Sequence, residues 1–320
     1  MAKTRYMSLQ DLIHHCCYLF VDPILWTSHH LEQVGCQFET VDTAQVDIHK
    51  DDKQPSNPQS AGHAEIFATN WISTCRDNAM YSLLLGKRRA FAKQEEDPDF
   101  YFARKSLHHT CIYTFRQHGK LKYHIRNRSP PWIGYLDYGC VVRSRSTLYN
   151  YSPDPSGRPN EIGRRLQEKR QALITPNDWT KDPYFLCLLL TLAQFQKRKL
   201  PSPRPKTYIS RLFVTRYKDK EYVHLYDAEI SAELLRALND PKAATSYVPF
   251  PTIKYRKLSF KPYDTFAERL STALVAPIED PIETGRKRHC EDEMESVSKR
   301  SCPDVVPQSD DLVWIKPPTT

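Results

Sequence analysis

Hydrophobic residues recur with a helical period in the second half of the chain. Residues 160–173 place Ile162, Leu166 and Leu173 on one side of a basic amphipathic helix. A strongly apolar helix is predicted to begin at Asp182 and Pro183 and to run to about residue 197, where basic residues suit the negative end of the helix dipole. Because apolar residues cover most of its circumference, we expect this second helix to be buried.

Alternating apolar residues predict strands beside these helices. Residues 208–217 and 222–227 are predicted to form a hairpin through the polar KDKE segment. A helix over 231–238, a strand over 252–260 and a helix over 263–275 are expected to follow. The order helix, strand, strand, helix, strand, helix predicts an α+β fold in which β-hairpins pack with helices.

The first half has weaker periodicity. Ser8 is a suitable N-cap for a short helix within residues 8–26, and residues 66–87 mostly fit a second helix. Two runs of β-branched and aromatic residues, 110–115 and 122–125, flank His118-Gly119 and predict a hairpin. A further strand is expected within 134–149.

Breaks in these patterns divide the chain into six segments. The polar stretch DDKQPSNPQS and the run YSPDPSGRP lack any apolar period, and the second is expected to mark a domain boundary. After residue 277 the sequence is polar and charged, which predicts a disordered tail. The segments are an N-terminal helical segment at 1–37, a polar linker at 38–62, an α+β part at 63–150, a break at 151–159, an α+β part at 160–277 and the tail at 278–320.

Composition narrows the class of protein. The 320 residues are 40% hydrophobic and carry a net charge of +8, which suits a globular chain with a mild preference for acidic partners. The nine cysteines are irregularly spaced, so we expect reduced thiols and an intracellular protein. No signal peptide is evident, and the longest apolar run, residues 184–193, is half the roughly twenty residues that a bilayer requires. We therefore expect no membrane association.

Two basic clusters in the tail are spaced like the halves of a bipartite nuclear-localisation signal. About ten residues separate them, and an extended tail would let them reach an import receptor. We predict a nuclear protein with an import receptor as a partner; the alternatives are a cytoplasmic location and a tail that is simply solvated. The basic residues are Arg286, Lys287, Arg288, Lys299 and Arg300.

Candidate chemistry is sparse. Histidines and cysteines cluster at residues 14–17, 29–36 and 108–109 without the paired spacing of a zinc site, so we predict no metal and no cofactor. Asp227 and Glu229 end a predicted strand in the manner of a PD-(D/E)xK nuclease, but the lysine of that motif is missing. Ordinary strand-end carboxylates explain them better, and no catalytic residue is assigned.

A basic face is a second candidate, with nucleic acid as the partner that it would bind. Arginines could contact phosphates and nearby tyrosines could stack on bases, although Glu161 and Glu168 interleave with the charges of the helix. A solvated surface is the alternative. The arginines are Arg126, Arg128, Arg143, Arg145, Arg164 and Arg165.

Several segments resemble a lineage-restricted family of uncharacterised proteins from filamentous ascomycete fungi. These are DPYFLCLLLTLAQ (182–194), RLFVTRYKDKEYVHLYDAEISAELLRAL (211–238), TIKYRKLSFKPYDTFAERL (252–270) and SLHHTCIYTFR (106–116). No activity is assigned to that family, so the resemblance implies a fungal, intracellular protein and no catalytic residues. We expect a non-catalytic protein that binds another macromolecule. The alternative is an enzyme, either a degenerate nuclease or an accessory factor in fungal secondary metabolism.

Overall fold

The computed structural model describes residues 7–16, 20–41, 58–85, 91–94, 98–117 and 132–276. Met1–Pro277 forms one compact unit. Its centre is a mixed sheet of seven strands in the order β1-β9-β8-β7-β6-β5-β2, in which β1 runs parallel to β9, β6 runs parallel to β7, and the other neighbours are antiparallel. The strands are β1 (Phe38–Thr40), β2 (Phe91–Gln94), β5 (Tyr113–Gln117), β6 (Trp132–Asp137), β7 (Thr207–Thr215), β8 (Tyr222–Ser231) and β9 (Ile253–Ser259).

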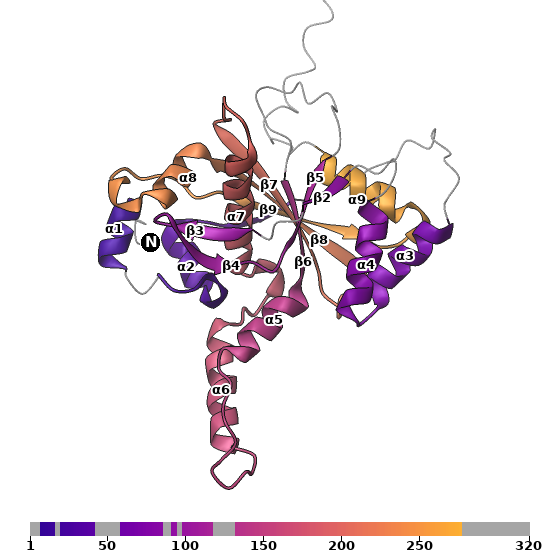
Figure 1. Cartoon of the computed structure of the whole chain (residues 1–320), viewed down its shortest axis with the longest axis horizontal. Helices are drawn as coiled ribbons and strands as arrows, with labels where there is room; N and C mark the ends of the chain where they lie inside the picture. Colours follow the sequence, from indigo (N-terminus) through magenta and orange to yellow (C-terminus); the bar gives the residue numbers. More distant parts are fainter. Residues whose placement is uncertain are drawn as a thin grey trace, which may run out of the picture. The chain divides into compact units, whose positions relative to one another are not determined.

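One face of the sheet is covered by the most apolar helix of the chain. Residues 184–196 of α7 (Tyr184–Lys199) are all buried. Gly134 of β6 lies directly beneath this helix, because a Cβ there would come within 3.0 Å of the Leu192 side chain. The same layer contains a small hairpin and three shorter helices (Figure 1). These are α1 (Leu9–His15), α2 (Ser28–Val34), α8 (Ala232–Asn239), β3 (Asp99–Phe102) and β4 (Lys105–His109).

The opposite face carries a second core. Phe67, Met80 and Leu270 are buried there against the sheet residues Tyr135 and Phe213. The helices of this layer are α3 (Pro58–Thr69), α4 (Ser73–Leu84) and α9 (Phe266–Val275), which Figure 1 shows together on one side of the sheet. The described residues therefore form three layers, with the sheet in the middle.

Two helices leave this layered body between β6 and α7. We call α5 (Tyr138–Thr147), α6 (Glu161–Ile174) and the loop between them the arm. Figure 1 shows α6 extending away from the sheet. The arm returns to the body through the single-turn helix η3 (Trp179–Lys181).

The expected elements of the C-terminal half are confirmed. The hairpin β7–β8, the helix α8, the strand β9 and the helix α9 appear in the predicted order, and Asp182 Oδ1 accepts a hydrogen bond from the Tyr184 amide at the start of α7 (2.9 Å). At the N-terminus, Ser8 caps α1 by accepting from the Asp11 amide.

The first half requires several corrections. The helix expected over 66–87 is two helices, α3 and α4, and the linker expected over 38–62 begins with strand β1 and ends inside α3. The strand expected within 134–149 is present as β6 (Trp132–Asp137), and the rest of that segment is mostly helix α5. The second strand of the hairpin expected at 122–125, and the tail at 278–320, lie outside the described residues.

The break at 151–159 does not separate two domains. Strands from both sides of it pair within one sheet, since β6 lies beside β7 over six residue pairs. The run YSPDPSGRP instead forms the turn of the arm, where Asp154 accepts hydrogen bonds from the Ser156 amide (2.7 Å) and the Arg158 amide (3.2 Å). This run of turn residues therefore marks a protrusion from one unit and not a boundary between two domains.

Candidate functional site

Helix α6 begins and ends with side-chain caps. Asn160 Oδ1 accepts from the Gly163 amide (2.8 Å), and Asn160 Nδ2 donates to the Ser152 carbonyl (3.0 Å) across the turn of the arm. At the other end, the Thr175 hydroxyl donates to the Gln171 carbonyl (2.8 Å). These caps fix the helix although little of it packs on the body.

One side of α6 faces the rest of the arm. Gln167 Nε2 donates to the Ser146 carbonyl at the end of α5 (2.9 Å), and Ile174 is buried. Gly163 lies so close to Tyr151 that a Cβ there would come within 2.9 Å of it. The side of α6 that contains residues 163, 167 and 174 is therefore already occupied.

The other side of α6 carries an apolar stripe that is open to solvent. Ile162, Leu166 and Leu173 lie within about 40° of one another around the helix axis, since each residue advances the helix by about 100°. Their exposed fractions are 82%, 47% and 77%. An apolar helix face normally packs against a core, so the exposure of this stripe makes it a candidate interaction surface.

Positive charge borders the stripe. Helix α6 contains four basic and two acidic residues. Arg164 is taken up by ion pairs with Glu161 (2.8 Å) and Glu168 (2.5 Å). Arg165 and Lys169, which flank the stripe, form no ion pair with any residue that the structure describes. The stripe therefore combines exposed apolar area with uncompensated positive charge.

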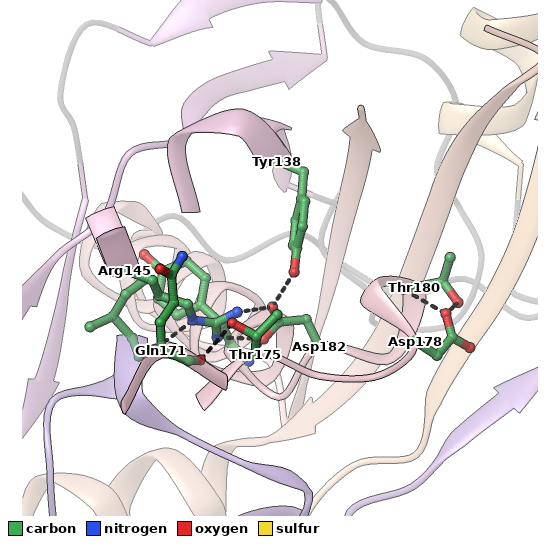
Figure 2. Close-up of polar contacts among 9 residues, drawn as sticks. Tyr138, Arg145, Gln171, Thr175, Asp178, Thr180 and Asp182 are labelled. Carbon is green, nitrogen blue, oxygen red and sulfur yellow. Dashed lines mark hydrogen bonds and ion pairs between the residues drawn. The ribbon is translucent and has the colours of Figure 1, made fainter. Parts of the chain in front are cut away.

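A buried ion pair anchors the arm to the body. Arg145 of α5 contacts Asp182 through two nitrogen–oxygen pairs, at 2.5 and 2.9 Å, and its Nε donates to the Ile24 carbonyl (2.9 Å) (Figure 2). Tyr138 donates its hydroxyl hydrogen to Asp182 Oδ2 (2.8 Å). The side chains of Arg145 and Asp182 are 2% and 0% exposed, so the pair is removed from water.

The electrostatics of this anchor follow from its burial. Burial, the largest influence, disfavours the charged form of Arg145, but the Asp182 carboxylate outweighs it, so that the pKa of Arg145 lies above its ordinary value. Burial, and then the charge of Asp182, raise the pKa of Tyr138. The arm is thus attached by an ion pair whose arginine holds its proton firmly, beside a neutral tyrosine.

A hollow of about 210 Å³ lies at the base of the arm beside this anchor. Trp179 and Arg216 line it, and both also line a neighbouring surface hollow. The Arg216 guanidinium lies 5.4 Å from the centre of the Trp179 ring and 5.8 Å from that of Tyr138. Gln171 lies on this side of α6, opposite to the stripe, so the hollow and the stripe are separate features.

An Asp–His pair near the hollow is structural. The Asp219 carboxylate can only accept, so His224 Nε2–H donates to it (2.8 Å) and Nδ1 accepts from the Tyr255 hydroxyl (2.8 Å). His224 is buried, and burial is the main reason that its pKa lies below the ordinary value. Because both ring nitrogens are engaged, the ring has no nitrogen to offer a substrate.

The structure disperses the expected basic face. Arg145 is buried in the anchor, Arg164 is paired within α6, and Arg143 donates to Cys140 Sγ (3.1 Å). Arg126 and Arg128 lie outside the described residues. Arg165 alone of the six is exposed without a partner in the part of the chain described here.

Asp227, one of the two carboxylates of the nuclease alternative, is used by the fold. Arg211 and Arg256 both bind Asp227, and both also donate to the Ala273 carbonyl near the end of α9. The two arginines therefore tie α9 to the sheet, and because they bind Asp227, this carboxylate is not available to a metal ion. Within the described residues, no three histidine, cysteine or acidic side chains lie close enough together to hold a metal.

Three of the candidate zinc ligands have other partners. His108 contacts Tyr184 Oη (2.7 Å) and Asp22 (2.8 Å), and His109 contacts Asp99 (2.8 Å). The Cys36 thiol donates to the Pro251 carbonyl (3.1 Å). Each contact serves the packing of the N-terminal helices and the β3–β4 hairpin.

Comparison with known proteins adds no function to this picture. No family model, no curated protein and no solved structure matches the chain. The resemblance to a fungal family therefore stays a prediction. No helix among the described residues has the length and apolarity needed to cross a membrane.

Proposed function

We propose that this protein acts by binding another protein, and that the apolar stripe of α6 with its flanking cations is the contact surface. The observation that carries the proposal is the exposure of Ile162, Leu166 and Leu173 on one face of a helix that projects from the body. Full burial of a side chain of this kind in an interface contributes about 1.5–3 kcal/mol. The stripe thus offers most of its apolar area to a partner.

The charges on α6 favour a partner of acidic chemistry. Arg165 and Lys169 lie at the edge of the stripe, and Arg170 stands 5.9 Å from the Tyr149 ring on the far edge. Two copies of α6 would bring like charges together, which opposes self-association. An amphipathic helix with an apolar face and acidic flanks would complement both the stripe and the charges.

We propose further that the protein works in the nucleus. The spacing of the two basic clusters at 286–288 and 299–300 supports this location. Import would require an import receptor as an additional partner. The stripe and the tail would then have separate roles, one in binding the functional partner and one in transport.

The protein-binding proposal can be tested with two synthetic helical peptides. Both carry the same leucine face, one has glutamate flanks and the other has lysine flanks, and fluorescence anisotropy measures their binding. We expect the acidic peptide to bind, with an affinity that falls as salt increases, and the basic peptide not to bind. A DNA duplex is the third probe.

Two charge-reversal variants locate the contact. The stripe variant is Arg165→Glu, Lys169→Glu and Arg170→Glu, and the matched control, with the same change of net charge at exposed positions elsewhere, is Lys105→Glu, Lys220→Glu and Arg236→Glu. The acidic peptide should lose affinity for the stripe variant only. Equal losses in both variants, or binding of the duplex that depends on the same three residues of α6, would contradict the proposal.

A further inference from the structure

The layer that contains α7 holds a second cavity. It has a volume of about 80 Å³ and lies where α1, α2, α7, α8 and the β3–β4 hairpin meet. A water molecule requires about 10–15 Å³ of such space, so the cavity has room for roughly six or seven non-hydrogen atoms. The volume is suitable for a single ring or a short chain.

The wall of this cavity is almost entirely apolar. Fourteen of the fifteen described residues that line it are hydrophobic, and His30 is the exception. Leu12, Leu186 and Leu190 are buried members of the core. Three large apolar residues that also line the cavity, Phe20, Val21 and Leu107, are exposed at 40%, 37% and 48%. An apolar molecule would therefore meet apolar side chains from the entrance inward.

Two polar atoms in this wall have no partner. Trp26 Nε1 and His30 Nε2 are shielded from solvent, and neither makes a hydrogen bond within the described structure. The two rings are stacked, with centres 6.3 Å apart and planes inclined by 18°. A buried polar group without a hydrogen bond destabilises a fold by about 1–3 kcal/mol, so such groups are usually satisfied by water or by a ligand.

Both unpartnered atoms are donors. The indole nitrogen of Trp26 can only donate. The Thr27 amide donates to His30 Nδ1 (3.0 Å), so the neutral ring carries its hydrogen on Nε2. Burial, helped by the neighbouring His29, lowers the pKa of His30 and keeps the ring neutral. Two residues of the cavity wall thus each carry an N–H group that lacks an acceptor.

We propose that this cavity binds a small, uncharged, apolar molecule that carries a carbonyl oxygen. One carbonyl oxygen has two lone pairs and can accept from two donors. No described residue of the wall carries a permanent charge, and burying a carboxylate without a cation is costly, so the neutral carbonyl is favoured. This site is independent of the protein-binding surface on α6.

Cyclohexanone and methylenecyclohexane provide a matched pair of probes. They have nearly the same shape and differ in whether an oxygen or a CH₂ group projects from the ring. The binding of each to the full chain is followed by the ¹H–¹⁵N signal of the Trp26 indole, which is assigned with Trp26→Phe. We expect cyclohexanone to move this signal downfield in a saturable manner, because a hydrogen bond forms at Nε1.

Two variants separate the contribution of the hydrogen bonds to affinity from the contribution of apolar burial. The alkene leaves water more readily than the ketone, so the affinities of the two ligands cannot be compared directly. For each ligand, ligand-observed NMR therefore compares the affinity of the wild type with that of the variants. Trp26→Phe and His30→Leu should each reduce the affinity for cyclohexanone by about two- to tenfold, the value of one hydrogen bond. The affinity for methylenecyclohexane should not decrease.

Three results would overturn the proposal. The first is no saturable binding of either probe to the wild type. The second is saturable binding of cyclohexanone that leaves the Trp26 indole signal unshifted. The third is an equal loss of affinity for both probes in the variants, which would show that water, and not the ligand, accepts hydrogen bonds from the two donors. The indole signal of the wild type decides the question even if a variant does not fold.

Discussion

Asp182→Asn removes the negative charge of the buried anchor and keeps the size of the side chain. Asp182 accepts from Arg145, from the Tyr138 hydroxyl and from the Tyr184 amide, and its side chain is fully buried. The variant leaves the Arg145 guanidinium buried without a countercharge. Breaking a buried pair in this way destabilises a protein by about 3–5 kcal/mol, and because no cavity is created, the charge accounts for the loss.

Urea unfolding measures this effect as a shift of the transition midpoint. Arg164→Ala is the matched control, because Arg164 also forms ion pairs with two carboxylate groups in the arm but is exposed to solvent. We expect a large decrease in midpoint for Asp182→Asn and none for the control. Replacing both partners, with Arg145→Met and Asp182→Leu, should recover much of the loss. If Asp182→Asn unfolds at the same urea concentration as the control, the anchor does not hold the arm as we describe.

The remaining predictions concern the stripe, a buried histidine and the tail. Replacing the three stripe residues with serine should change the free energy of unfolding by no more than about 0.5 kcal/mol per site, because they are exposed, and a larger loss in thermal unfolding would show that the stripe packs within the chain. Folding lowers the pKa of His224 below its unfolded value of about 6.5, so its contribution to stability is complete above that pH and falls as the pH decreases below it. Urea midpoints between pH 5 and 7.5 should therefore rise with pH more steeply in the wild type than in His224→Gln, and identical slopes would refute this. A fluorescent fusion of the full chain should concentrate in the nucleus, and a variant with five alanines should not; equal distribution would remove the nuclear hypothesis. The five positions are Arg286, Lys287, Arg288, Lys299 and Arg300.

The fold of the C-terminal half could be predicted because its periodicity is strong. The buried helix α7 and the hairpin β7–β8 are nearly continuous apolar segments bounded by clear caps and turns. The hairpin β3–β4 was missed because its turn has no glycine: Ala103 and Arg104 adopt positive φ angles of 49° and 66°. Residues with a side chain seldom adopt that conformation, so the sequence carries no turn signal there.

The candidate site was only partly predictable. The apolar residues of α6 were identified as one side of a helix, but an amphipathic pattern does not tell whether that side faces the core or solvent. Arg145 was assigned to a surface because arginine is rarely buried, and its partner Asp182 lies 37 residues away. Arg216 and Trp179 come together only through the return of the arm, and no local sequence signal marks them.

The most direct test of the central claim is site-specific photo-crosslinking in the cell that produces the protein. A benzoylphenylalanine at position 166 probes the stripe, and the same residue at position 71 is the control, because Trp71 is 79% exposed outside the arm. We predict that position 166, and not position 71, crosslinks to a partner protein at an acidic amphipathic segment, and that Arg165→Glu with Lys169→Glu abolishes the crosslink. Equal products from both positions, or a crosslink from position 166 to a second copy of the chain or to nucleic acid, would contradict the account.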